Sequence, residues 1–151
     1  MRTLLAATIA VFMLAPAAHA AGDDVKTIES DAAFADVVSG IENAIVNRGF
    51  KVDYHGFIGD MLKRTASDVD AGKALYKDAE FFTFCSAVVS RKVMEADIGD
   101  IAYCPYVVFA YETEAKPGAV TVGFRMLPDG GERDAVNALL SGIITDAADG
   151  M

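Results

Sequence analysis

The stretch Phe82–Glu112, FTFCSAVVSRKVMEADIGDIAYCPYVVFAYE, contains both cysteines of the chain and has a β-prone segment at each end. Aromatic and β-branched residues in these two segments favour strands. Between them, Ser86 is suited to begin a helix over Ala87–Ala96, because its hydroxyl can accept a hydrogen bond from an early backbone N–H. The pattern therefore predicts a strand–helix–strand unit, with Cys85 at the end of the first strand and Cys104 at the start of the second.

The relative direction of these two strands decides whether the cysteines can meet. In a parallel unit the two chain positions lie at opposite edges of the sheet, roughly 20 Å apart at ~3.3 Å per residue. A disulfide needs Cα atoms within about 7 Å of each other. In an antiparallel neighbouring pair the same two positions lie side by side. The disulfide between Cys85 and Cys104 and the antiparallel pairing are therefore predicted together or not at all.

The N-terminus is typical of a secretory signal peptide. Residues 1–20 read MRTLLAATIAVFMLAPAAHA, with the basic Arg2, a short apolar run and an A-x-A site that ends at Ala20. The apolar run is shorter than the roughly 20 residues that span a bilayer. We expect cleavage after Ala20, export to the periplasm or secretion, and one mature domain over residues 21–151 that has no membrane segment.

The charge of the chain argues against polyanionic partners. Its formal net charge is −9 at pH 7, and loss of Arg2 with the signal peptide makes the mature protein more acidic. Such a surface repels nucleic acid and anionic lipid. Acidic residues in predicted loops, such as Asp97 and Asp100, lack the spacing of a calcium loop, and we expect them to be solvated. No G-x-S-x-G, P-loop or dinucleotide-binding motif is present, so no catalytic residue and no cofactor are predicted, and a non-catalytic protein is favoured.

Three interpretations of the cysteine pair remain open. An exported protein keeps its disulfides, and closing a loop of about 20 residues contributes roughly 3 kcal/mol of stability. Alternatively, the helix that follows Cys85 could stabilise a thiolate there, with Cys104 as the resolving thiol of a redox protein. The spacing is not C-x-x-C, which gives that chemistry no motif support. The third interpretation is two buried thiols that act as small hydrophobic residues. The structural bridge is favoured.

The chain as a whole predicts an α+β domain in the order β-α-β-α-β-α-β-β-α, with a mainly antiparallel sheet and helices packed mainly on one side. The predicted elements are strand Val25–Ser30, helix Asp31–Arg48 capped by Ser30, strand 50–58, a weak helix over 59–72, strand Ala79–Cys85, helix Ala87–Ala96, a loop over 98–103, strand 104–112, turn Lys116–Gly118, strand 119–126 and helix Glu132–Ala147. In the weak helix, we expect Met61, Leu62 and Val69 to point inward.

His55 is the one histidine of the expected mature chain. In its predicted strand, Val52 and Tyr54 alternate with Asp53 and His55, so we expect His55 to face solvent or to lie at the sheet edge. A lone histidine can bind a metal or haem iron, with a cysteine as a second ligand. A zinc site usually requires three or four ligands, however, and an ordinary surface histidine is favoured.

Aromatic residues mark both faces of the strand CPYVVFAYE. Tyr106 and Val108 lie on one face, and Phe109 and Tyr111 lie on the other with Val107. One face must pack against the helices, and the other needs a cover, which could be a second subunit in a homodimer or an apolar ligand. The candidate binding residues are therefore His55, Tyr106, Phe109 and Tyr111.

Several of these motifs occur together in a known family. The pairs Phe84-Cys85, Cys104-Pro105 and Tyr111-Glu112, with the helix Val88–Ala96 between the cysteines, resemble the pattern of the domain-of-unknown-function family 302, over about Lys26–Leu127. The resemblance implies a compact α+β fold that is often dimeric, with no established activity and no catalytic residue.

Together these observations predict an exported, non-catalytic binding or accessory module whose aromatic sheet face meets a ligand or a protein partner. The alternatives are a thiol-based redox or sensor protein that uses Cys85 and Cys104, and a haem- or metal-binding protein that uses His55.

Overall fold

A computed structural model describes residues 24–150, so the predicted signal peptide lies outside the described residues. Its elements are β1 (Val25–Ser30), α1 (Phe34–Asn47), β2 (Val52–Gly56), α2 (Ile58–Thr65), the 3₁₀ helix η1 (Ala66–Val69), β3 (Tyr76–Phe84), α3 (Ala87–Ala96), the 3₁₀ helix η2 (Ile98–Tyr103), β4 (Tyr106–Thr113), β5 (Val120–Arg125) and α4 (Arg133–Ala148). Within residues 24–150, no helix combines the length and apolar character that crossing a bilayer requires.

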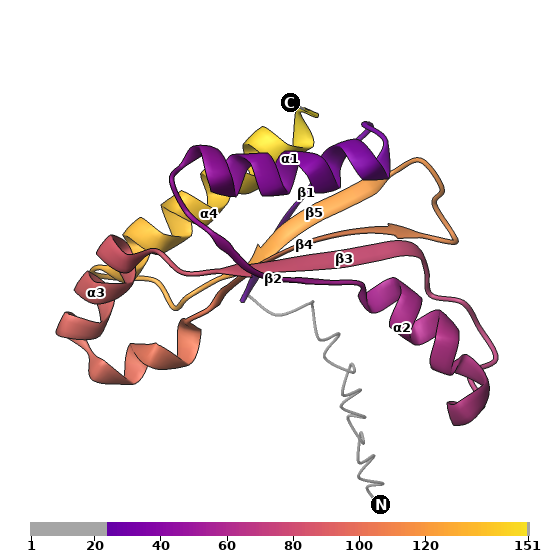
Figure 1. The fold of residues 1–151 in the computed structure, drawn as a ribbon, viewed down its shortest axis with the longest axis horizontal. Coiled ribbons are helices and arrows are strands. Elements are labelled where there is room, and N and C mark those ends of the chain that lie inside the picture. Colours follow the sequence, from indigo (N-terminus) through magenta and orange to yellow (C-terminus); the bar gives the residue numbers. More distant parts are fainter. Residues whose placement is uncertain (1–23, 151) are drawn as a thin grey trace, which may run out of the picture.

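The five strands form one antiparallel sheet in the order β1-β5-β4-β3-β2. Helices α1 and α4 cover one face of this sheet, while α2 lies on the opposite side beside β3 (Figure 1). The predicted α+β class and the order β-α-β-α-β-α-β-β-α are confirmed. A loop of a few residues joins β4 to β5, as expected for a hairpin with a Lys-Pro-Gly turn.

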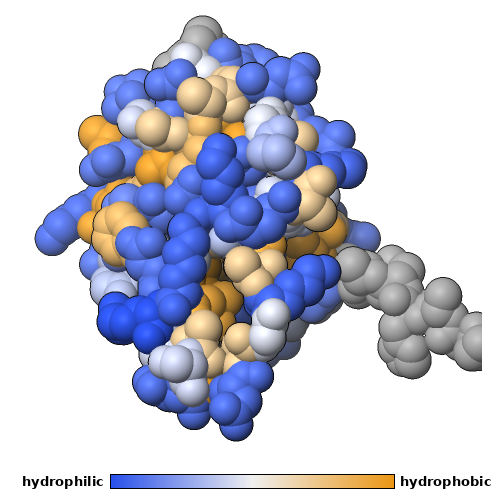
Figure 2. Space-filling view, turned by 90° about the vertical axis from the view of Figure 1, so that its right-hand side faces the viewer, coloured by the Kyte–Doolittle hydropathy of each residue, from blue (hydrophilic) through white to orange (hydrophobic). Residues whose placement is uncertain are grey.

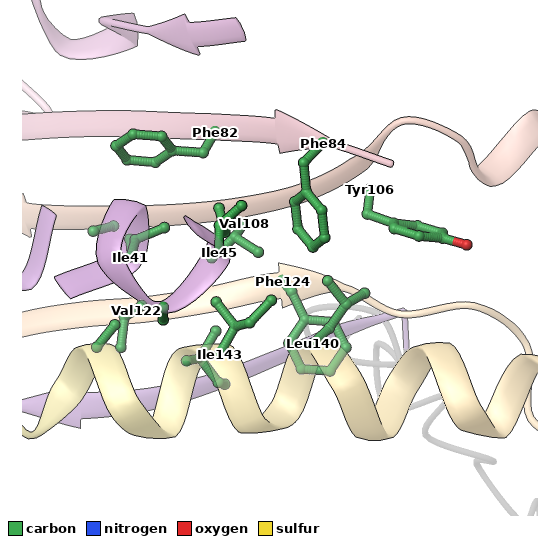
Figure 3. Close-up of a cluster of buried hydrophobic side chains, with 14 of the residues drawn as sticks. Ile41, Ile45, Phe82, Phe84, Tyr106, Val108, Val122, Phe124, Leu140 and Ile143 are labelled. Carbon is green, nitrogen blue, oxygen red and sulfur yellow. The ribbon is translucent and has the colours of Figure 1, made fainter. Parts of the chain in front are cut away.

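The hydrophobic core fills the space between the sheet and helices α1 and α4 (Figure 3). Alternation along β4 buries Val108 and Ala110 on the helix-covered face. Helix α1 contacts β4, and α4 contacts the neighbouring strands β5 and β1 and buries Leu140 and Ile143 in the same core. The largest fully buried side chains are Phe82, Phe84, Phe124, Ile41, Ile45, Leu140, Ile143, Ile144, Val37, Val108, Val120 and Val122. The core thus lies on one face of the sheet, and the opposite face is not part of it.

The predicted cap of the first helix is wrong. Helix α1 begins at Phe34 after the N-cap residue Ala33, three residues later than expected. The hydroxyl of Ser30 instead donates a hydrogen bond to the carbonyl of Ala148 at 2.6 Å and accepts one from the N–H of Ala32. The Ser30 hydroxyl, which the local sequence predicts to be a helix cap, therefore makes a long-range contact with the end of α4 instead.

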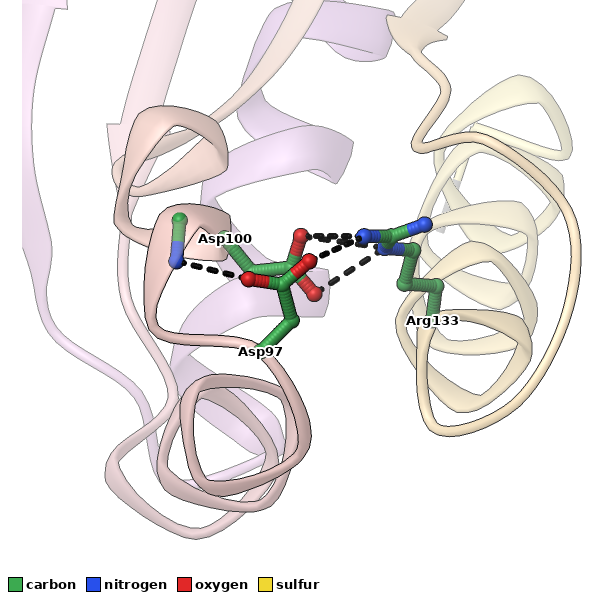
Figure 4. Close-up of polar contacts among 4 residues, drawn as sticks. Asp97, Asp100 and Arg133 are labelled. Atoms are coloured by element: carbon green, nitrogen blue, oxygen red, sulfur yellow. Dashed lines mark hydrogen bonds and ion pairs between the residues drawn. The ribbon is translucent and has the colours of Figure 1, made fainter.

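The segment 98–103, expected to be a loop, is the 3₁₀ helix η2, and an arginine holds it to α4 (Figure 4). The guanidinium of Arg133 donates to both carboxylate oxygens of Asp100 and lies 3.3 Å from Asp97. The ring of Tyr103 lies 5.9 Å from the same guanidinium. The expectation that Asp100 is solvated is wrong, because its side chain is only 4% exposed beneath this ion pair. This cluster therefore links η2 to the start of α4.

Candidate functional site

The cysteines lie at the end of the sheet where β3 stops and β4 begins. Cys85 and Cys104 form a disulfide with their Cα atoms 6.3 Å apart. The residues just inside the bridge, Phe84 and Tyr106, are direct partners in the antiparallel pairing of β3 with β4. The predicted link between the bridge and the antiparallel pairing is therefore confirmed. The disulfide fastens two strands that are already paired, which is the arrangement of a structural crosslink.

His55 lies on the edge strand β2, as expected, but its side chain does not face solvent with Asp53. A bulge between Val52 and Tyr54 shifts the alternation, so that His55 lies opposite Phe82. The imidazole stacks on Phe82 with ring centroids 4.0 Å apart, and its Nε2 atom lies 2.5 Å from a carboxylate oxygen of Glu80. Within residues 24–150, no three histidine, cysteine or acidic side chains are grouped to hold a metal. The half-buried His55 is thus held by Glu80.

Tyr106 is part of the core and is not available to a ligand on the surface. Its ring is 3% exposed, and its hydroxyl shares a hydrogen bond with that of Ser90 at 2.8 Å. Burial raises the pKa of the Tyr106 phenol above its usual value, although the bond to Ser90 opposes this shift. The inclusion of Tyr106 among the binding candidates is therefore corrected.

Phe109 and Tyr111 lie on the open face of the sheet, which is the face opposite α1 and α4. Their direct partners on β3 are Phe81 and Ala79. The three aromatic residues are half-buried, whereas Ala79 is buried. Phe109 stacks on Tyr111 with centroids 6.2 Å apart. The two binding candidates that the sequence placed on one face therefore share a surface with two residues of the neighbouring strand.

Two glycines determine how the rings on the open face lie. A Cβ atom at Gly123 would be 2.7 Å from the ring of Phe109, and a Cβ atom at Gly56 would overlap the ring of Phe81. Each ring thus leans over a glycine on the strand beyond it, where a side chain would displace it. Because β5 and β2 lie on opposite sides of the β4–β3 pair, the two rings lean apart. The surface between them is left open.

Helix α2 forms a wall beside this opening. A Cβ atom at Gly59 would lie 2.8 Å from the backbone nitrogen of Ala79, so the first turn of α2 rests directly on β3. Between the helix and the sheet runs a groove of about 360 Å³. We call it the sheet groove, and its lining residues are Ile58, Leu62, Tyr76, Ala79, Glu80, Phe81, Phe109, Ala110 and Tyr111.

A second hollow adjoins the sheet groove. It has a volume of about 320 Å³ and lies between α2, η1 and the segment that leads into β3. Figure 2 faces this end of the molecule and shows apolar residues gathered in a recess between hydrophilic ones. We call it the α2 hollow, and its lining includes Leu62, Lys63, Val69, Lys73, Leu75 and Tyr76. Leu62 and Tyr76 line both spaces, which are therefore neighbours.

The expectation that Met61, Leu62 and Val69 point inward is wrong, since they are 36%, 37% and 70% exposed. The helical spacing of these apolar residues is the same on either side of the sheet, and α2 lies on the side away from the core. Leu62 borders both cavities and Val69 borders the α2 hollow, whereas Met61 borders neither of them. In the sequence, the one sign of this placement is Gly59 at the start of an amphipathic helix.

Comparison with known proteins gives a structural neighbour. No protein-family model and no curated protein matches the sequence. A crystal structure of an uncharacterized conserved protein, DUF302, from Bacillus stearothermophilus superposes with a TM-score of 0.63 at 10% identity, covering 85% of this chain and 98% of that chain. The two proteins share a fold. The resemblance to the domain-of-unknown-function family 302 is thus supported at the level of structure, and the neighbour is described without an activity.

Proposed function

We propose that the protein is an exported, non-catalytic binding module that holds an apolar ligand in the sheet groove. The observation that carries this proposal is the groove itself. Two aromatic rings, displaced toward glycines, and a helix seated on β3 enclose about 360 Å³ of mainly apolar space. Pockets for small ligands commonly have volumes of about 300–1,000 Å³ and are lined mostly by apolar and aromatic residues.

Several features of the groove support a binding role. Its apolar lining is distributed over α2, β3 and β4, so that these side chains stay accessible although the domain has a separate, fully packed core. The exposed apolar side chains nearby include Tyr54, Phe57, Leu62 and Leu75. Large exposed apolar surfaces on a domain mark sites of interaction. A ligand in the groove would remove these groups from water and would be bound mainly by the hydrophobic effect.

Export is the second half of the proposal. The N-terminal pattern, which ends in Ala18-His19-Ala20, is that of a cleaved signal, and the Cys85–Cys104 disulfide is suited to an oxidising compartment. Intact mass measurement on protein from a periplasmic extract tests it. A chain that begins at Ala21 is expected, and a full-length chain that stays in the cytoplasm would contradict export.

Titration with Nile red, a neutral apolar dye whose emission rises in apolar surroundings, tests the binding site. Wild type is expected to bind the dye at one saturable site, and Leu62→Gln is expected to weaken binding at least fivefold. Met61→Gln is the matched control, because Met61 immediately precedes Leu62 in α2, is about equally exposed and lines neither cavity. No saturable binding to wild type, or an equal loss in both variants, would overturn the proposal.

A further inference from the structure

The α2 hollow combines apolar walls with two cationic groups. Leu62, Val69 and Leu75 contribute aliphatic surface, and Lys63 and Lys73 line the same space. The chain has 22 acidic and 13 basic residues, yet the described residues that line this hollow include two lysines and no acidic residue. The position of these two lysines is therefore a feature of the cavity that a purely apolar ligand does not explain.

The two lysines differ in their partners. The ammonium group of Lys63 lies 3.8 Å from Asp78 and donates a hydrogen bond to the carbonyl of Lys77. Among residues 24–150, no carboxylate lies within 4.0 Å of the ammonium group of Lys73. Asp68 and Asp70 belong to the preceding turn but do not line the hollow. Lys73 is thus the cation that is free to meet an anionic group.

The two cavities together form an elongated site. The α2 hollow is lined mainly by aliphatic residues, and it adjoins the aromatic sheet groove at Leu62 and Tyr76. A linear chain can follow such a path from one space into the other, whereas a compact ligand would fill only one of them. Each methylene group that enters the path adds to the affinity through the apolar area removed from water.

From this arrangement we infer that the site takes a single-chain amphiphile with an anionic head, of the class of a long-chain carboxylate, whose head is bound by Lys73. This inference rests on the proposed function and specifies its ligand. Beside an apolar wall, the ammonium and carboxylate groups attract each other more strongly than in bulk water, and their hydrogen bond is charge-assisted. The chain then extends past Leu62 into the sheet groove.

Displacement of bound Nile red by three twelve-carbon amphiphiles tests the head group. Dodecanoate, dodecanol and dodecyltrimethylammonium carry the same chain with an anionic, a neutral and a cationic head. The two ionic compounds are used below their micelle concentrations, and dodecanol is used below its solubility limit. Dodecanoate is expected to displace the dye at a concentration at least tenfold lower than dodecyltrimethylammonium. Equal displacement by all three would overturn the anionic head while leaving the apolar site intact.

Substitution of Lys73 tests where the head binds. Lys73→Gln is expected to weaken dodecanoate binding about fivefold to tenfold and to leave dodecanol binding unchanged, because only the charge is removed. Lys92→Gln, at an exposed position on α3, is the matched control and is expected to change neither. Unchanged dodecanoate binding in Lys73→Gln would overturn the assignment of the head to Lys73. Failure of Nile red to bind wild type would instead contradict the proposed function itself.

Discussion

The ring of Phe109 occupies the space above Gly123, where a side chain at that position would stand. Gly123 is buried on β5 and is the direct partner of Phe109 on β4. A Cβ atom there would also lie 2.6 Å from the backbone carbonyl of Lys26 on β1. Gly123 therefore has two roles, since it lets β1 and β5 approach each other and lets the ring of Phe109 lie over β5 at the border of the sheet groove.

The first prediction follows from this contact. Gly123→Ala is expected to lower the free energy of unfolding by about 1–3 kcal/mol, the usual cost of overpacking, because the carbonyl of Lys26 cannot move without disturbing the sheet. Urea denaturation measures the change. Gly72→Ala is the matched control, since a Cβ atom at Gly72 would meet no atom within 4 Å, and a shift within about 0.5 kcal/mol is expected there. Equal stabilities of the two variants would contradict the contact.

The second prediction concerns the disulfide. Replacing both Cys85 and Cys104 by alanine is expected to destabilise the fold by roughly 3 kcal/mol, because the unfolded chain loses the constraint of a closed loop of about 20 residues. Reduced wild type should unfold at the same urea concentration as the variant, and oxidised wild type at a higher one. Nile red binding should survive in the folded variant, since neither cysteine lines the sheet groove. Loss of binding with retained folding would favour a thiol-dependent function.

The third prediction concerns Glu112 and acid. Its buried carboxylate accepts a hydrogen bond from the N–H of Gly118 at 2.6 Å and one from Lys77 at 2.9 Å, and these bonds hold its pKa below the ordinary value of 4.5. A lowered folded-state pKa stabilises the fold above pH 4.5, and this contribution is lost as the pH falls through the folded-state pKa.

Glu112→Gln is therefore expected to be less stable than wild type at pH 7, with a difference that shrinks below pH 4.5. Denaturation curves across this range measure it. Glu42→Gln, at an exposed position on α1, should track wild type at every pH. A difference for Glu112→Gln that stays constant down to the acid limit would show that the carboxylate charge is not what stabilises the hairpin.

The fourth prediction concerns Tyr106 and alkali. Because burial raises the folded-state pKa of this phenol above 10.0, its contribution to stability is complete below pH 10.0 and is lost as the pH rises through the folded-state pKa. The ultraviolet absorbance of tyrosinate should show one tyrosine that ionises late, and this component should vanish in Tyr106→Phe. Tyr54→Phe, at a side chain that is 60% exposed, should remove an ordinary component instead.

Tyr106→Phe should also lower stability by about 1–3 kcal/mol, since it leaves the hydroxyl of Ser90 without its buried partner. A spectrum in which all tyrosines ionise together would contradict the burial of Tyr106.

The local sequence pattern correctly predicts those elements whose interacting residues are close together in the chain. The alternation in β4 and β5, the Lys-Pro-Gly turn and the hydroxyl of Ser86 are local features, and they predicted the hairpin and the start of α3 correctly, with Ser86 accepting from the N–H of Val89. The short Cα–Cα distance that a disulfide requires also predicts correctly that the Cys85–Cys104 bridge and the antiparallel pairing of the two strands occur together. What failed was the face of His55, because a one-residue bulge in β2 reverses every side chain that follows it and leaves no mark in the hydrophobic pattern.

The α+β class, the order of the elements and the two faces of β4 thus follow from the residue pattern alone, because these features depend on the periods of strands and helices and on turn chemistry. The residue pattern does not predict which face of the sheet the helices cover. An apolar stripe of this kind can face the core, but in α2 it borders a cavity. The reason is that Gly59 lets α2 pack closely on β3, on the side of the sheet away from α1 and α4. Seating of this kind depends on contacts between residues far apart in the chain, and an amphipathic pattern is the same on either side of a sheet.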